Sequence, residues 1–198
     1  MSHRPHHRPT TPGSHHFEAI SAGVDPAELR EAADRAAALL VRGAHDSDDA
    51  AVAGRLLSLA DTEGIETIAE VWSGSPGDSL AGCLWRLFLL RSWVWTDPVG
   101  VAKQFEAGRG AAPVALVVAG VADPPGPDQL RAMIDSVLSG ITEGDFADVL
   151  FRAAGFARVV ATGRAALTTT SEQEVVRMLA LAEQLEAAGH VELTHGLA

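Results

Sequence analysis

The run from Ser79 to Pro98, SLAGCLWRLFLLRSWVWTDP, constrains the fold most, because it has the length of a helix and apolar residues at almost every position. A helix that is hydrophobic all round is either a membrane span or the centre of a packed domain. A span needs about 20 apolar residues, whereas this run is shorter and contains Arg86 and Arg91. We therefore expect residues 79–95 to form a central, buried helix that has no solvent face.

Helix signals on both sides of this run indicate an all-α fold. The segment PVALVVAGV at 113–121 is ambiguous between a strand and a short buried helix, and we interpret it as a helix because no second strand is available to pair with it. Capping residues and apolar spacing of i, i+3, i+4 predict the other helices. These cover 26–43, 46–61, 65–72, 98–107, 130–138 and 146–163, followed by a last helix that begins after a capping box at Ser171–Glu174.

The chain divides into a tail and one domain. Residues 1–16 are rich in His and Pro and contain no acid, so we expect a disordered tail. Residues 17–198 show neither a repeat nor an internal linker. They are therefore predicted to form a single compact multi-helix domain around the central apolar helix at about 79–95.

Composition narrows the classes of partner. Without the tail, the chain carries a net charge of about −13, which disfavours direct binding to nucleic acid. Cys83 is the single cysteine, so an intrachain disulfide and a multi-cysteine zinc site are excluded. The N-terminal residues lack the apolar core of a secretory signal. We expect a cytoplasmic protein that contacts neither nucleic acid nor membrane.

The candidate binding residues of the apolar run are Arg86, Arg91 and Trp85. Two arginines five positions apart on a helix point about 140° away from each other, towards different neighbours. They could clamp an anionic ligand, or they could pair structurally with acids. We expect each arginine to be paired within the fold, because an unpaired buried charge is costly. The acids considered are Asp97, Asp145 and Asp148. The four tryptophans, Trp72, Trp85, Trp93 and Trp95, could line a pocket or a partner interface, or belong to the core.

A second candidate site is the stiff loop that contains Asp123, Pro124 and Pro125. Proline-rich loops lose little entropy on binding. With the acidic surface around it, this loop could contact a protein partner that carries a basic patch. The alternative is that it only turns the chain between two buried helices.

The sequence offers no convincing metal or catalytic site. The His-rich tail lacks a scaffold, and the acids of His45-Asp46-Ser47-Asp48-Asp49 are better explained as helix caps. Glu192-Leu193-Thr194-His195 has the spacing of half a di-iron motif, but the second half is absent. No phosphate loop, dinucleotide fingerprint or nucleophile elbow occurs. We therefore expect no enzyme activity, no cofactor and no metal.

Three blocks of the chain suggest a family. They are SLAGCLWRLFLLRSWVWTDP, PVALVVAGVADPPGP and VLSGITEGDFADVLFRAAGFARVVATGRA. Together they resemble a family of small helical proteins from actinobacteria, whose members are often labelled DNA-directed RNA polymerase subunit beta. The resemblance implies a helical fold and an association with RNA polymerase. A catalytic polymerase role would need a much longer chain with basic nucleic-acid channels.

Two functions follow as hypotheses. The first is a non-enzymatic helical interaction or scaffold protein, which two paired arginines and an exposed apolar groove would favour. The second is a small-molecule-binding protein with a pocket between the tryptophan helix and the helix at 146–163. A cavity lined by an arginine without an acidic partner would favour the second.

Overall fold

The computed structural model describes residues 26–43, 71–112, 126–143, 145–167 and 171–198, and these form helices and no strand. The all-α prediction is therefore confirmed for this part of the chain. The tail 1–16 and the helices predicted over 46–61, most of 65–72 and 113–121 lie outside the described residues. The helices are α2 (Pro26–Arg42), α5 (Leu80–Thr96), α6 (Pro98–Arg109), α8 (Pro127–Glu143), α9 (Phe146–Ala166) and α10 (Glu172–His195). None of these has the length and hydropathy that crossing a bilayer requires.

Side chains at the helix starts fix where four of the helices begin. The Ser79 hydroxyl accepts a hydrogen bond from the Gly82 N–H at 3.1 Å, which starts α5. Asp97 ends α5 and also starts α6, because its carboxylate accepts from the Gly100 N–H at 2.9 Å. Asp145 caps α9 in the same way, and Ser171 forms the predicted capping box with Glu174 at the start of α10. These caps satisfy N–H groups that have no partner within the helix.

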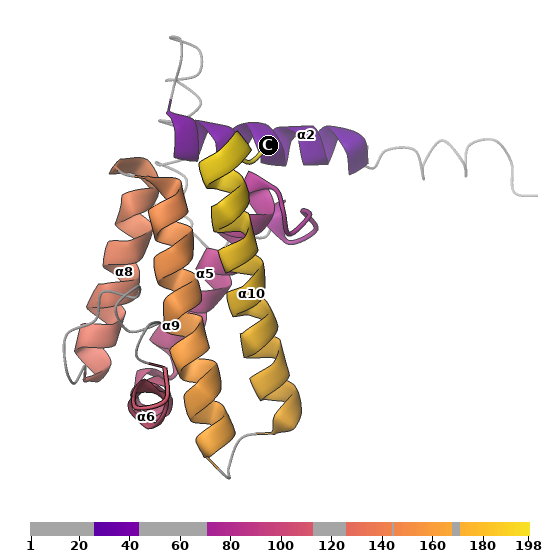
Figure 1. The fold of residues 1–198 in the computed structure, drawn as a ribbon. Helices are drawn as coiled ribbons and strands as arrows, with labels where there is room; N and C mark the ends of the chain where they lie inside the picture. The colour runs from indigo at the N-terminus through magenta and orange to yellow at the C-terminus, as the bar shows by residue number, and fades with distance from the viewer. Residues whose placement is uncertain (1–25, 44–70, 113–125, 144, 168–170) are drawn as a thin grey trace, which may run out of the picture.

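Helices α5 and α9 contribute most of the buried core. Figure 1 shows α9 and α10 as a pair of long helices side by side, with α8 and α6 also near α9, α5 behind, and α2 across one end. Thirteen residues of α9 and nine of α5 are buried. Along α5, Leu89 is 45% exposed and Trp95 is 42% exposed. The expectation that this helix has no solvent face is therefore wrong, and α9 has the larger buried share.

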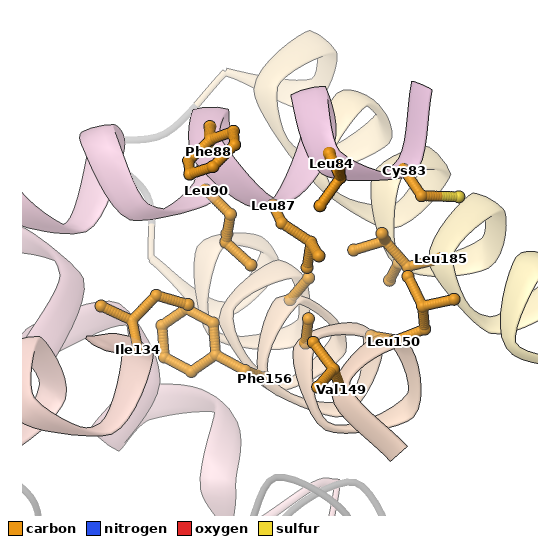
Figure 2. Packing of buried hydrophobic residues seen from close by; sticks show 14 of the residues in the cluster. Cys83, Leu84, Leu87, Phe88, Leu90, Ile134, Val149, Leu150, Phe156 and Leu185 are labelled. Carbon is orange, nitrogen blue, oxygen red and sulfur yellow. The ribbon is translucent and has the colours of Figure 1, made fainter. Parts of the chain in front are cut away.

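Part of the buried side of α5 faces α9 and α10, while α5 also contacts α2 and α8. Figure 2 shows Leu84, Leu87 and Leu90 directed at side chains of α9, among them Val149 and Phe156. Leu185 of α10 closes the same cluster, and all of these side chains are at most 2% exposed. Removing this much apolar surface from water is the main stabilising contribution to such a fold.

Helices α6 and α9 touch through their backbones at two glycines. A Cβ atom at Gly163 would lie 1.6 Å from the carbonyl oxygen of Gln104, and one at Gly108 would lie 1.9 Å from that of Val159. No side chain fits in either place. The two glycines therefore set the distance between these helices.

The last residues connect α2, α5 and α10. The Leu80 N–H donates to the Ala198 carbonyl at 2.9 Å. The Glu192 carboxylate accepts from both Nη atoms of Arg42 and from the Leu197 N–H, and its side chain is 7% exposed. Gly196 makes the turn with a φ of +74°. Glu192 thus has a structural role, in place of the half di-iron motif weighed from the sequence.

Changing Arg42 to Met is expected to lower the free energy of unfolding at pH 7 by about 2 kcal/mol, because Glu192 loses its charged donor. The hydrogen bond from Arg42 lowers the pKa of Glu192. The contribution is therefore fully present above the unfolded-state pKa of about 4.3 and is lost as the pH falls through the lower folded-state pKa. Urea unfolding at pH 7 and at stepwise lower pH measures it.

The matched control is Arg35→Met, because Arg35 pairs with Glu31 and their side chains are 71% and 79% exposed. This exposed pair should contribute little at any pH. Equal losses for the two variants at pH 7 would contradict the assigned role of Glu192.

Candidate functional site

An open pocket of about 340 Å³ lies between the start of α5 and the second half of α10. The pocket hypothesised from the sequence lies between the tryptophan helix and the helix at 146–163, whereas this pocket is lined by α5 and α10. Charged groups, an amide and an apolar wall meet in it, as in many small-molecule sites. Its lining residues are Gly77, Asp78, Arg86, Gln184, Ala187, Ala188 and Val191.

Arg86 is the cation of this pocket. Its Nε donates to Gln184 Oε1 at 2.8 Å, and its Nη1 donates to the Gly82 carbonyl at 2.8 Å. Its Nη2 lies against Gly77, where a Cβ atom would be only 2.8 Å away. Among the described residues, no carboxylate forms an ion pair with Arg86.

The acids that the sequence offered as partners are used elsewhere. Asp97 and Asp145 cap helices, and Asp148 lies 4.0 Å from Arg152. The expectation that Arg86 pairs with one of these acids is therefore wrong. An amide and a backbone carbonyl hold the guanidinium and leave its charge without a counter-charge.

The wall that carries Gly77 and Asp78 is held in place by the loop before α5. The Ser79 hydroxyl donates to the Pro76 carbonyl at 2.9 Å, and a Cβ atom at Gly82 would lie 1.7 Å from the same oxygen. The loop therefore rests directly on the first turn of α5. A pocket wall held this way is preorganised for binding.

Arg91 lies in a different environment, as the 140° separation predicted. Its Nε donates to Asp135 Oδ1 of α8 at 2.8 Å, and the same oxygen accepts from the Trp95 indole at 3.1 Å. The guanidinium groups of Arg91 and Arg131 lie 5.0 and 5.1 Å from the Trp95 ring centroid. Arg91 is thus paired within the fold, with Asp135 instead of the acids that the sequence suggested.

The tryptophans divide between core and surface. Trp72 is fully buried, stacks on Phe88 with 5.6 Å between ring centroids, and donates to the Ala33 carbonyl at 3.0 Å. Trp85 and Trp93 are half-buried against the core, and the Arg164 guanidinium lies 4.7 Å from the Trp93 ring centroid. Trp85 does not line the described pocket.

Cys83 lies buried beneath the pocket wall. Its thiol donates to the Gly77 carbonyl at 3.6 Å, and burial raises its pKa to about 12. A thiol that stays protonated at neutral pH is neither a nucleophile nor a good metal ligand.

The remaining candidate binding and metal-site residues from the sequence analysis lie outside the part of the chain that the structure describes. They are Asp123, Pro124 and Pro125, the His-rich tail and the 45–49 segment. Within the residues that the structure describes, no group of three His, Cys, Asp or Glu side chains could hold a metal ion.

Sequence reasoning missed Gln184, Asp78 and Asp135. Gln184 and Asp135 lie 98 and 44 positions from the arginines that they contact. A local pattern cannot reveal such pairs. One feature of the sequence does indicate partners on other helices: neither arginine has an acid at i±3 or i±4 on its own helix.

Comparison of the chain with family models, with curated proteins and with solved structures finds no match.

Proposed function

We propose that this protein is a non-enzymatic, cytoplasmic binding protein that holds an anionic ligand at Arg86, in the pocket between α5 and α10. The observation that carries the proposal is the half-buried guanidinium that lines a pocket without a described acidic partner. A charge taken partly out of water is stabilised by an opposite charge. A bound carboxylate would supply that charge.

The hydrogen bonds around Arg86 favour a carboxylate at this place. The Nε atom and one N–H of Nη1 are occupied by Gln184 and Gly82, while Nη2 has no hydrogen-bond partner among the described residues. The two nitrogens at the end of the guanidinium therefore retain N–H donors. Charge-assisted bonds from guanidinium N–H groups to a carboxylate are among the stronger hydrogen bonds in proteins.

Changing Arg86 to Gln is expected to lower the free energy of unfolding by only about 1 kcal/mol, through the loss of its hydrogen bonds to Gln184 and Gly82, and to abolish binding of a simple carboxylate. No described carboxylate is left without its partner by this change, so the usual penalty for breaking an ion pair is absent. The probe is 4-methylpentanoate, titrated calorimetrically, for which we expect a dissociation constant on the order of millimolar in the unchanged protein.

Arg91→Gln is the matched control, because it removes a cation from the same helix and leaves Asp135 without its ion pair. It should lower stability and keep binding. Failure of the unchanged protein to bind the probe, or equal binding by the Arg86 variant, would overturn the proposal.

A second candidate function is protein interaction, which one observation favours. Leu89 is 45% exposed between the half-buried Trp85 and Trp93 at i−4 and i+4, so the outward side of α5 is apolar. Apolar and aromatic surface of this kind is enriched at interfaces. Association with RNA polymerase, which the family resemblance implies, belongs to this candidate. It predicts that capture of a partner survives Arg86→Gln and is lost when Leu89 is replaced by Asp.

A further inference from the structure

We infer that the ligand of the α5–α10 pocket is a small zwitterion of the α-amino-acid class with an apolar side chain, an inference that rests on the proposed function. The observation is that the pocket presents one positive and one negative group that do not pair with each other. Arg86 and Asp78 both line it, yet they form no ion pair. A ligand that carries both charges a few bonds apart complements both groups.

Asp78 is the acid of this arrangement. Its side chain makes no ion pair and no hydrogen bond with the described residues. It lies at the end of the loop held on the first turn of α5, where Ser79 and not Asp78 provides the helix cap. Asp78 is exposed and the capping role is already filled, so its carboxylate is available to accept a hydrogen bond from a ligand ammonium group.

The same acid disfavours other anions. A phosphate dianion at Arg86 would share the pocket with the negative charge of Asp78, and like charges at close range repel. A simple carboxylate would satisfy Arg86 alone. An α-amino acid places its carboxylate on Arg86 and its ammonium on Asp78, so that both protein charges are compensated.

The remaining wall defines the side chain of the ligand. Ala187, Ala188 and Val191 of α10 provide apolar surface, with Ala188 3% exposed and Val191 39% exposed. The volume of about 340 Å³ lies at the lower end of the roughly 300–1,000 Å³ typical of ligand pockets. This space suits a single amino acid with an aliphatic side chain, not a nucleotide-sized cofactor.

The test compares three probes that share one aliphatic body: L-leucine, 4-methylpentanoate, which lacks the ammonium group, and 3-methylbutylamine, which lacks the carboxylate. Calorimetric titration of the full chain should show leucine binding about tenfold more tightly than 4-methylpentanoate, the gain expected from one charge-assisted hydrogen bond. The amine should bind more weakly than leucine as well.

Two variants assign the contacts. Asp78→Asn should remove the tenfold advantage of leucine and should not weaken 4-methylpentanoate, whereas Arg86→Gln should weaken both. The control is Asp128→Asn, which removes an exposed acid from the first turn of α8, away from the pocket, and should leave every affinity unchanged.

The outcomes separate the two proposals. L-leucine and 4-methylpentanoate could bind through Arg86 with equal affinity, and Asp78→Asn could leave both affinities unchanged. That result would overturn the zwitterion inference, and the proposed function would stand. If no probe binds, or if Arg86→Gln changes no affinity, both are overturned.

Discussion

An alanine at position 163 is expected to lower the free energy of unfolding by about 3 kcal/mol, a large effect for the addition of one methyl group. The new Cβ would lie 1.6 Å from the Gln104 carbonyl oxygen and 2.8 Å from the Gly108 nitrogen, both of which are backbone atoms of α6. Backbone cannot rotate away as the end of a side chain can. Helix α6 would have to move off α9, and the stacked Phe105 and Phe156 rings between them would separate.

Gly110→Ala is the matched control, since Gly110 has a right-handed φ of −67° and a Cβ atom there would meet nothing within 4 Å. Urea unfolding followed by circular dichroism should place this variant within about 0.5 kcal/mol of the unchanged protein. A Gly163→Ala protein of comparable stability would show that α6 and α9 do not approach as described.

Leu87→Ala is expected to lower the free energy of unfolding by about 2–5 kcal/mol. Leu87 is 0% exposed, and Figure 2 shows it in the cluster between α5 and α9. Truncating it removes buried apolar contacts and leaves a cavity that tightly packed neighbours fill only in part.

Leu89→Ala makes the same chemical change two residues away, at a side chain that is 45% exposed. Its cost should be below about 1 kcal/mol, because surrounding water already contacts much of the side chain. Chemical unfolding of both variants gives the comparison. Equal losses of unfolding free energy in the two variants would contradict the described orientation of α5, in which Leu87 is buried and Leu89 is exposed.

The features that could be predicted from the sequence are those fixed by neighbouring residues. Asp97, Asp145 and Ser171 each accept from an N–H two or three positions further along, so their capping roles follow from local spacing. For α5 the sequence left Asp78 and Ser79 as alternative caps, and the structure shows Ser79 in this role. The apolar face of α9 followed in the same way from the helical period, and its residues are buried.

The features that the sequence did not predict depend on which helix surfaces pack against each other in the folded protein. The apolar composition of α5 could not show which sides of the helix are covered, and Leu89 and Trp95 are exposed although they are as apolar as their buried neighbours. Arg86 and Arg91 were expected to have acidic partners because a buried charge needs one. That requirement is met for Arg91 by Asp135, and Arg86 instead contacts Gln184, a residue that only the packing of α10 against α5 brings close.

The reactivity of the buried Cys83 thiol can be used to measure how often the structure around it opens. Because it is the single cysteine of the chain and its pKa is raised to about 12, alkylating reagents have almost no thiolate to attack in the closed state. Modification can then proceed only through states in which the start of α5 separates from the loop at Gly77. The rate of alkylation thus measures how often this end of the molecule opens, and a ligand that bridges the pocket wall would slow it in proportion to its occupancy.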